Sequence, residues 1–579
     1  MRRAAPWLAA GIAGVALWLL LAPAQGSSAE RIRLGAVAVR PNPVEVGRRV
    51  RVGSAIRNRV AVSRRARVAI SLQRTRRSRR LRIALRPFSR VRDVGRRGFS
   101  LRARIPRRVA PGRYYVAVCI RSEGRRACRL SRRRLAVVSP GGQPGEQPGA
   151  PRGVVHQTIE GFGSSARVFE DPHVFNVNGP APAMTGAQRD AVLAALYGDL
   201  GLTRVRPVQP ETAAGPPPVG IEAENDNSDP NATDLSRFNF SGRRLDLHAA
   251  HVIRARAHGA TVAWTSPLNR EAWMGVSTGA DAAEYAEWLL AQVRRFRDQG
   301  ARLSYVSVAN EPSYARNTMS GGFIRDVIKN LGPRLEAEGL LVPFVLPDDV
   351  RSSNGAAVAA TVLADSAARR YVGALATHLY DEPITNVSSM SALAKKYGLP
   401  LWMTEFSIDA MGSAGLARQP IDWTLLMHEL LARYDVSAID YFWGFIGAGA
   451  DSSLIKLNHT GDTYTGFTRN KVYYYFGQFS RFVRPGARRV SATSSDNRIK
   501  VSAYYRGDTR VLVAINPADS PVSTRLSAAD LAGVPSLTAI RTSPTENWAN
   551  VPRADVSGEG ISVTLPPRSA TTFSGEAAK

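Results

Sequence analysis

The sequence predicts a multidomain protein: a (β/α)8 barrel with a β-sandwich on its C-terminal side, preceded by a separate all-β sandwich. Three observations support this prediction. Short apolar strands alternate with longer helix-like segments between residues 153 and 484, whereas the regions 31–138 and 485–579 show strand patterns only. A stretch rich in proline and glycine, residues 139–152, separates the first sandwich from the barrel. Eight strands alternating with helices over about 300 residues are typical of this barrel, with an open doubly wound sheet as the alternative.

The N-terminus has the order of a secretory signal peptide. Met1-Arg2-Arg3 is followed by an apolar run from about Trp7 to Leu21 and then by Ala22-Pro23-Ala24. We therefore predict a signal peptide over residues 1–24 and an extracellular protein, with retention at the cell surface as a further expectation. An uncleaved anchor is the alternative, although the run is shorter than the roughly 20 apolar residues that a spanning helix needs.

The positive charge of the chain is confined to one region. The formal net charge is +31, and residues 31–140 contain 34 arginines and no lysine against three acids, Glu45, Asp93 and Glu123. The difference of 31 accounts for the whole net charge, so the remainder of the chain is neutral. A charge-based interpretation therefore applies to the first sandwich and not to the barrel.

The region 31–138 alternates apolar and polar residues, as in Arg49-Val50-Arg51-Val52, which predicts a small antiparallel sandwich. Cys119 and Cys128 flank a turn-like segment between two strand-like stretches. This spacing permits a disulfide across neighbouring strands, and two free buried thiols are the alternative. No cysteine and histidine group has metal-ligand spacing, because His248 and His251 stand alone on a helical stretch.

A sandwich this basic is expected to bind anionic polymers by a salt-sensitive Coulombic attraction. For an exported protein the expected partner is an anionic cell-wall or surface polymer, and nucleic acid is not expected. The alternative is that codon bias favours arginine and that the charges only solvate the sheet. Bias explains the missing lysine but not the missing acids.

The eight barrel strands are predicted from short apolar runs with a β-like composition. After 485 the rhythm becomes strand-only, which predicts the second sandwich over residues 485–579. Gly161-Phe162-Gly163 follows a strand but is not interpreted as a dinucleotide-binding fingerprint, because the segment after it is loop-like. The barrel strands are expected to begin as follows: Val154-Val155 leading into Gly161, then Thr203, Thr261, Ser304, Phe344, Ala374, Leu401 and Ala438.

Polar residues close several of these strands, and in a barrel the strand ends form the active site. The fourth strand closes with Asn310-Glu311-Pro312 and the seventh with Glu405. Two carboxyl groups ringed by aromatic residues suit glycoside hydrolysis, in which one carboxylic acid protonates the leaving oxygen and one carboxylate attacks the anomeric carbon. Further closures come from Trp264, His378-Leu379-Tyr380 and Trp443, with Trp273 and Tyr314 nearby.

From about Gln157 to the C-terminus, the chain resembles glycoside hydrolase family 30, within clan A of the barrel glycosidases. The resemblance lies in four motifs, of which the last is the most family-specific. They are Ile159-Glu160-Gly161-Phe162-Gly163, Ala309-Asn310-Glu311-Pro312, Met403-Thr404-Glu405-Phe406 and the segment from Tyr475 to Gly486.

The resemblance implies that Glu311 is the general acid/base and Glu405 the nucleophile of a retaining enzyme. It implies that Asn310 binds a sugar hydroxyl and that Arg206 keeps Glu405 ionised. The residues expected to line the sugar-binding subsites are Trp264, Trp273, His378, Tyr380, Trp443 and, more weakly, Tyr314.

The chain departs from the family in two places. Ala309 stands where glutamine often precedes Asn-Glu-Pro, and the Ser-Pro-Pro-x-Trp-Met stretch is extended to Ser266–Met274. That loop shapes the cleft, so xylan, β-1,6-glucan and β-1,6-galactan all remain candidate substrates. The loop after the second strand, with Glu222, Glu224 and Asp226, is expected to be solvated.

The function predicted from the sequence is hydrolysis of a β-linked polysaccharide or oligosaccharide by a secreted enzyme that needs no metal and no organic cofactor and acts as a monomer. The alternative is a non-catalytic adhesin that binds carbohydrate or cell wall through a degenerate barrel. The presence of both Glu311 and Glu405 argues against the alternative.

Overall fold

A computed structural model describes most of the chain. Its residues form two compact units, 1–148 and 149–579, and each unit is considered by itself. The predicted signal peptide and the predicted linker, 139–152, lie outside the described residues. The described ranges are 34–40, 44–45, 49–56, 67–73, 83–90, 98–105, 112–122, 125–131, 135–138, 153–209, 220–314, 318–340, 342–380, 382–407, 419–446 and 453–577.

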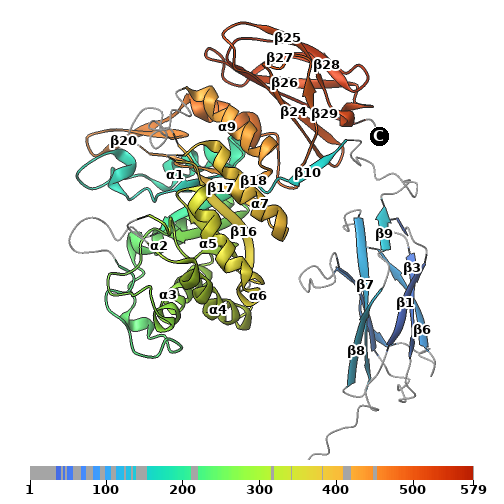
Figure 1. The fold of residues 1–579 in the computed structure, drawn as a ribbon, viewed down its shortest axis with the longest axis vertical. Coiled ribbons are helices and arrows are strands. Elements are labelled where there is room, and N and C mark those ends of the chain that lie inside the picture. Colours follow the sequence, from blue (N-terminus) through green and yellow to red (C-terminus); the bar gives the residue numbers. More distant parts are fainter. Residues whose placement is uncertain are drawn as a thin grey trace, which may run out of the picture. The chain divides into compact units, whose positions relative to one another are not determined.

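The N-terminal unit is a β-sandwich, which confirms the predicted class (Figure 1). One sheet has the order β1-β3-β6 and the other the order β2-β9-β7-β4-β5, with β8 paired to β7. Alternate residues of β3 and β4 are buried in the core, for example Val50 and Val52, or Val68 and Ile70. Apolar alternation with period two therefore forms one shared core between the sheets. The strands are β1 (Leu34–Arg40), β2 (Val44–Glu45), β3 (Arg49–Ile56), β4 (Arg67–Gln73), β5 (Ile83–Arg90), β6 (Gly98–Arg104), β7 (Gly112–Ser122), β8 (Arg125–Leu130) and β9 (Leu135–Val138).

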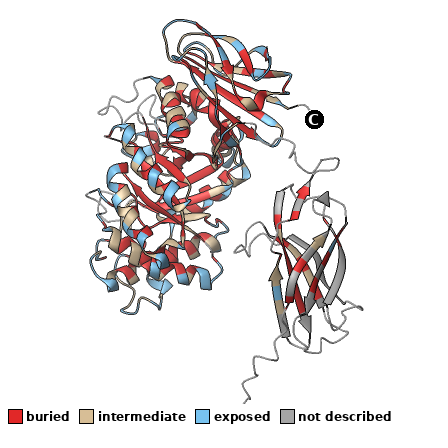
Figure 2. Cartoon of the chain, turned by 45° about the vertical axis from the view of Figure 1, so that its right-hand side comes forward, coloured by how far each residue is buried: buried red, intermediate tan, exposed pale blue. Residues whose placement is uncertain are grey.

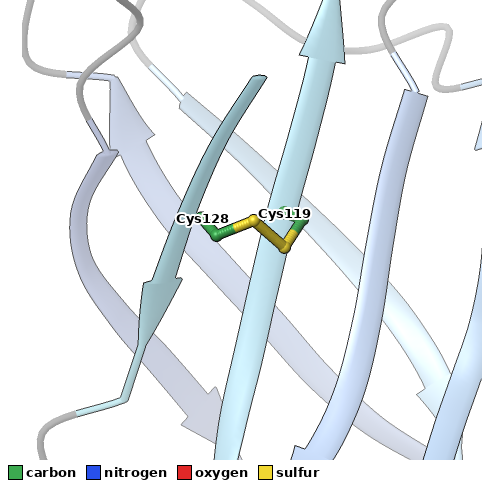
Figure 3. The surroundings of a disulfide bond; sticks show 2 residues. All are labelled: Cys119 and Cys128. Carbon is green, nitrogen blue, oxygen red and sulfur yellow. A yellow bond between two sulfur atoms is a disulfide. The ribbon is translucent and has the colours of Figure 1, made fainter. Parts of the chain in front are cut away.

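The two cysteines form a disulfide between β7 and β8 (Figure 3). Cys119 and Cys128 are directly opposite in the antiparallel register, with their Cα atoms 4.0 Å apart. The expected cross-strand bridge is thus confirmed, and the alternative of free thiols is not. The bond fastens β8 onto β7 of the larger sheet.

The second unit contains a closed barrel of eight parallel strands, as predicted. Its strands run in sequence order around the barrel, and β18 closes it by pairing with β11. Figure 2 shows the strands as largely buried and the exposed residues concentrated on the surrounding helices. The barrel strands are β11 (Gly161–Ala166), β12 (Arg204–Gln209), β13 (Val262–Pro267), β14 (Tyr305–Ser307), β15 (Phe344–Asp349), β16 (Val372–His378), β17 (Leu401–Glu405) and β18 (Val436–Tyr441).

The helices between the strands have signals that fix their ends. Thr278 and Asp281 form a capping box at the start of α3, and Gly398 ends α7 in the left-handed conformation. The buried face of each long helix packs against the strands in one continuous core. The helices are α1 (Gly186–Leu193), α2 (Asp246–Ala257), α3 (Gly279–Asp298), α4 (Gly321–Ala337), α5 (Ser352–Ala364), α6 (Ser366–Arg369), α7 (Val387–Tyr397), α9 (Pro420–Arg433) and α10 (Lys471–Ser480).

One predicted strand belongs elsewhere in the fold. The segment expected to lead into the first barrel strand is β10 (Val155–Thr158), and it pairs with β21 (Arg488–Val490) of the C-terminal sandwich. The barrel itself begins at Gly161. The sandwich thus takes a strand from each side of the barrel along the chain, which binds the two parts together.

The C-terminal sandwich has a larger sheet of order β10-β21-β23-β24-β29-β26-β27 and a smaller one of order β22-β25-β28. A hairpin of β19 and β20 precedes it. The remaining strands are β19 (Ile455–Thr460), β20 (Thr463–Arg469), β22 (Thr493–Ser494), β23 (Lys500–Arg506), β24 (Thr509–Asn516), β25 (Val522–Ser527), β26 (Ser536–Thr542), β27 (Ala549–Asp555), β28 (Gly560–Leu565) and β29 (Ser569–Glu576).

Helix α10 joins the barrel to this sandwich through specific polar and ring contacts. The buried Gln478 donates to Thr542 Oγ1 at 2.8 Å and accepts from Thr572 Oγ1 at 2.7 Å. Beside it, a Cβ on Gly477 would lie 2.3 Å from the Trp548 ring. Glycine at 477 is therefore required for the close approach of Trp548 to the helix.

No helix among the described residues combines the length and the apolar character needed to cross a membrane. The predicted signal segment is outside the residues to which this finding applies.

We predict that Gly477→Ala destabilises the barrel–sandwich contact, because the added methyl group overlaps the Trp548 ring. Overpacking of this kind costs about 1–3 kcal/mol. The measurement is the thermal unfolding midpoint, with Gly279→Ala as control because nothing lies within 4 Å of a Cβ at that position. Equal midpoints for the two variants would contradict the prediction.

Candidate active site

Glu311 and Glu405 lie at the same end of the barrel, because parallel strands bring all their carboxyl ends together. Glu405 is the last residue of β17 and is almost fully buried. Glu311 follows β14 and keeps 18% of its side chain exposed. Its backbone is in the left-handed region with φ 51°, and its N–H donates to the Asp348 carbonyl oxygen at 2.8 Å. This conformation holds Glu311 at the mouth of the barrel.

His378 lies between the two glutamates. Its Nδ1 is 2.9 Å from Glu311 Oε1 and 3.5 Å from Glu405 Oε2, and its Nε2 is 3.1 Å from Asp348 Oδ1. Both ring nitrogens face carboxyl oxygens, an environment that favours the imidazolium form of the ring. The sequence predicted a role for His378 in lining a subsite. The structure instead buries it completely, where it positions the carboxylates.

Arg206 is the second buried cation of the site. Its Nη1 donates to Glu405 Oε1 and, at 3.1 Å, to Ser165 Oγ. Its Nη2 donates to Asn310 Oδ1 at 2.6 Å and to Asp348 Oδ2 at 2.9 Å. The expected proximity of Arg206 to the nucleophile candidate is therefore present in the structure. The contact with Asn310 also fixes which end of that amide is the acceptor.

Asp348 holds this network together and was not identified from the sequence. It is completely buried at the end of β15, where it accepts from Arg206, His378 and Thr404, the last at 2.7 Å. Its backbone carbonyl also accepts from Glu311. The available signal was the polar pair Asp348-Asp349, which closes the fifth strand as Glu405 closes the seventh.

The charges of the site shift one another's protonation. Burial by itself would lower the pKa of His378, but Glu405 and Asp348 outweigh it and raise that pKa to about 10. Burial would raise the pKa of Asp348, but the Arg206 guanidinium and the His378 imidazolium hold it well below its usual range. Burial raises the pKa of Glu405, and His378 and Arg206 act against this rise.

Tyr380 completes the set around Glu405. Its hydroxyl donates to Glu405 Oε2 at 3.0 Å, and burial raises the pKa of this phenol well above its usual value. Glu405 thus faces donors on both oxygens: Arg206 on Oε1 and Tyr380 on Oε2. This arrangement fits the ionised form of the carboxylate, which only accepts hydrogen bonds.

Among the described residues, Glu311, His378 and Glu405 also form the one group that could hold a metal ion by proximity, with one ligand atom from each within 4.8 Å of the others. A metal would need a free lone pair on His378, and both of its ring nitrogens are already within hydrogen-bonding distance of carboxyl oxygens. The donor set therefore fits a metal poorly at neutral pH.

The structure places Trp264 away from the cleft surface, contrary to the expectation. Trp264 is fully buried inside the barrel, where its Nε1 donates to Asp440 Oδ2 at 3.1 Å and its ring packs near Trp402. A ring with no exposed area offers no face to a sugar. The Trp264 ring instead packs against the Arg206 guanidinium, whose central carbon is 5.0 Å from the ring centroid. Trp264 therefore helps to position Arg206.

A second ion pair, missed from the sequence, lies in this deeper layer. Arg204 donates to both oxygens of Asp440, at 2.9 and 3.0 Å, and its guanidinium lies 4.0 Å from the Trp402 ring centroid. Both charged side chains are buried. Arg204 and Arg206 are two residues apart on β12, so they point to the same side of the strand and form successive layers.

The other aromatic candidates lie on loops or strand ends. Trp443 follows β18, is 8% exposed and lies near the Arg167 guanidinium, and the Phe442–Trp443 peptide is cis. Trp273 is half-buried and donates to the Glu222 carbonyl at 2.8 Å. Tyr314 is 49% exposed, beside Glu311 along the chain. These three residues remain candidates for contact with substrate.

The loop after β12 is less solvated than expected. Glu222 is buried, with 3% exposed, and burial raises its pKa to about 8. Glu271 is also buried, and its Oε1 accepts from the backbone N–H of Ile221 and Glu222. Glu224 is exposed, as expected. These hydrogen bonds join the loop after β12 to the segment 271–273 that follows β13.

Comparison with known proteins finds distant relatives among enzymes that are named for their action on glycans. The chain is 26% identical over 294 residues to glucuronoxylanase XynC of Bacillus subtilis (strain 168), which covers 50% of this chain and 65% of that protein. It is 24% identical over 368 residues to an endo-1,6-β-D-glucanase of Neurospora crassa, covering 58% and 73%. The chain therefore spans less than two thirds of the first of these relatives. No family model matches the sequence.

Solved structures show the same fold. A family 30 endoxylanase from Clostridium papyrosolvens C71 superposes with a TM-score of 0.56 at 25% identity, covering 73% of this chain and 98% of that one. The catalytic domain of xylanase C from Talaromyces cellulolyticus gives 0.57 at 22%, covering 74% and 99%. The chain resembles glycoside hydrolase family 30. Its barrel and side sandwich are the fold of these glycoside hydrolases.

The charge on His378 leads to a pH-dependent stability. Its pKa of about 10 in the folded protein lies above the roughly 6.5 of an unfolded histidine, so the folded state retains a proton that the unfolded state has lost. The stabilisation is complete below about pH 6.5 and is lost as the pH rises toward 10, by up to about 1.4 kcal/mol per pH unit. We expect His378→Gln to remove this slope between pH 7 and 9, measured by denaturant unfolding.

His428→Gln is the control for that measurement. Burial lowers the pKa of His428 to about 4, so this residue is neutral throughout the range and its loss should leave the slope unchanged. An identical pH slope for wild type and His378→Gln would show that His378 is not the charged group.

Proposed function

We propose that residues 153–577 form a retaining glycoside hydrolase that cleaves β-linked glycans by double displacement. The supporting observation is the separation of the two carboxyl groups, because an oxygen of Glu311 lies within 4.8 Å of an oxygen of Glu405. Retaining enzymes place these groups about 5 Å apart, whereas inverting enzymes leave about 6.5–9.5 Å for a water molecule.

The charges around the site assign the two roles. Arg206 and His378 contribute two positive charges, which Asp348 and Glu405 balance. Glu405 accepts hydrogen bonds from Arg206 and Tyr380 and is therefore the carboxylate that attacks, which leaves Glu311 as the general acid. Glu311 is also the most exposed of the three carboxyl groups, which suits donation to a leaving group that departs toward solvent.

The reaction then proceeds in two steps. Glu405 attacks the anomeric carbon and forms a glycosyl ester while Glu311 transfers its proton to the departing glycosidic oxygen. Glu311, now ionised, removes a proton from water, the hydroxide attacks the anomeric carbon, and the ester bond to Glu405 breaks. Arg206 and Tyr380 remain bonded to Glu405 and stabilise its carboxylate as a leaving group. Asn310, held by Arg206, is placed to bind a sugar hydroxyl.

Xylan, β-1,6-glucan and β-1,6-galactan are the proposed substrates. The names of the relatives support the first two, since one is a glucuronoxylanase and another an endo-1,6-β-glucanase. The extended loop 266–274 and the exposed Tyr314 are where this chain would differ in substrate selection. A non-catalytic adhesin is the competing function.

We also propose that the protein is secreted as a monomer through the predicted signal peptide and is retained at the cell surface by an anionic polymer. The Met1–Ala24 pattern supports export, and the arginine content of residues 31–140 supports retention. An extracellular location also agrees with a disulfide in the basic unit.

The first test is the pair Glu311→Gln and Glu405→Gln on a panel of xylan, β-1,6-glucan and β-1,6-galactan. We expect wild type to release reducing ends from at least one polymer and each variant to lose about 10²–10⁴-fold in kcat/KM or more. Glu338→Gln, which alters an ion pair of α3 and α4, is the matched control and should keep full activity. Binding to the panel without turnover by wild type would support the adhesin instead.

The second test follows the stereochemistry of the first product. A double displacement inverts the anomeric carbon twice, so proton NMR should show the β-anomer of the new reducing end before mutarotation. An α-anomer as the first product would contradict the retaining mechanism while leaving hydrolysis itself established.

A further inference from the structure

The sheet register of the N-terminal unit places arginines directly opposite one another. Arg40 on β1 is paired with Arg51 on β3, and Arg51 is paired with Arg102 on β6. This row crosses the whole three-stranded sheet. Arg49 and Arg104 form a second pair two residues along the same strands.

The larger sheet has a longer row. Arg67 on β4 is paired with Arg90 on β5 on one side and with Arg121 on β7 on the other. Arg121 is in turn paired with Arg126 on β8. Four neighbouring strands therefore each place an arginine at the same level.

Both rows occupy the face of their sheet that is turned away from the core. In the smaller sheet, Val50 and Val52 are buried and Arg51 between them is exposed. Residues paired across strands share a face, so positions 40 and 102 lie on the face of Arg51. In the larger sheet, Val68 and Ile120 belong to the core between the sheets, which places the neighbouring positions 67 and 121 on the opposite face.

Such rows are unfavourable for the unit by itself. Strands are about 4.8 Å apart, and like charges directly opposite on neighbouring strands destabilise a sheet. The sequence of residues 31–140 supplies only three acids for 34 arginines. Codon usage can set which basic residue is used, but it does not align arginines across strands. An external polyanion would relieve the repulsion along each row.

We propose that the two arginine rows, Arg40–Arg51–Arg102 and Arg90–Arg67–Arg121–Arg126, bind a linear acidic polysaccharide of the uronic-acid type. Arginine, rather than lysine, presents a planar fork that matches a carboxylate with two hydrogen bonds. The choice of a polysaccharide rests on the proposed function, because the same chain carries a barrel resembling glycan hydrolases. Binding through the rows would raise the local concentration of glycan around the catalytic unit.

The test uses the full-length protein and polygalacturonic acid as probe. Arg40→Gln/Arg51→Gln/Arg102→Gln removes one row. We expect the affinity for polygalacturonate at low salt to fall at least tenfold, and the dependence of log Kd on log salt to become shallower, because fewer counterions are exchanged. The thermal midpoint of the variant should stay equal or rise, since repulsion between the arginines is removed.

The matched control removes three positive charges from the second unit. Arg237, Arg370 and Arg498 have side chains that are 49%, 58% and 53% exposed, so Arg237→Gln/Arg370→Gln/Arg498→Gln changes the net charge equally. We expect this control to bind polygalacturonate within about twofold of wild type. An equal loss in both variants would show that only net charge matters and would overturn the proposal.

Polyphosphate and a short DNA duplex, compared at equal charge concentration, test the class of ligand. Tighter binding to either than to polygalacturonate would overturn the assignment to an acidic polysaccharide. These measurements are independent of catalysis, because they can be repeated with Glu405→Gln. Absence of hydrolysis by the wild-type protein, with row-dependent binding present, would contradict the proposed function alone. Hydrolysis by the wild-type protein without row-dependent binding would contradict the rows alone.

Discussion

The buried guanidinium of Arg206 is the group on which the catalytic end of the barrel depends. It contacts Glu405, Asp348, Asn310 and Ser165 from the interior of the barrel, where water cannot replace a lost partner. A buried charge is stable only if it is paired and hydrogen-bonded, so each partner of Arg206 is held in one position. The Arg206 guanidinium packs on the Trp264 ring, and the Arg204–Asp440 ion pair lies in the next layer of the barrel interior.

Asp348 extends this constraint to the second glutamate. The Asp348 carboxylate pairs with Arg206, which also pairs with Glu405, and it contacts the His378 ring. The Asp348 backbone carbonyl accepts a hydrogen bond from the N–H of Glu311. The two glutamates are thus placed relative to each other by one buried anion and two buried cations. This explains why His378 and Tyr380 are enclosed beside Glu405 and are not laid out as a surface for sugars.

The two units of the chain use charge in opposite ways. At the catalytic end of the barrel, the charges are buried and compensated within hydrogen-bonding distance. In the N-terminal sandwich, arginines are repeated across strands with almost no acids in the sequence to neutralise them. The first arrangement fixes atoms for a reaction. The second produces a positive electrostatic potential around the sandwich, which attracts anionic molecules.

Much of this could be predicted from the sequence because it depends on local periodicity. Apolar runs separated by helical segments gave the barrel, alternation gave the sandwiches, and the ends of strands four and seven indicated Glu311 and Glu405. A nine-residue separation across a turn was enough to expect the Cys119–Cys128 bridge. These features follow from hydrophobic periodicity and residue spacing within short segments of the sequence.

Only the tertiary structure decided which residues meet. Asp348, Arg204 and Asp440 are separated by more than a hundred residues from some of their partners, so no local pattern showed which side chains pair. Likewise, the sequence placed Trp264 at the end of a strand, but it lies within β13 (Val262–Pro267) and its side chain is in the interior. The sequence by itself therefore determined the elements and the two glutamates. The closure of the barrel determined the buried charges that hold those glutamates, because burial and pairing exist only once distant strands are brought together.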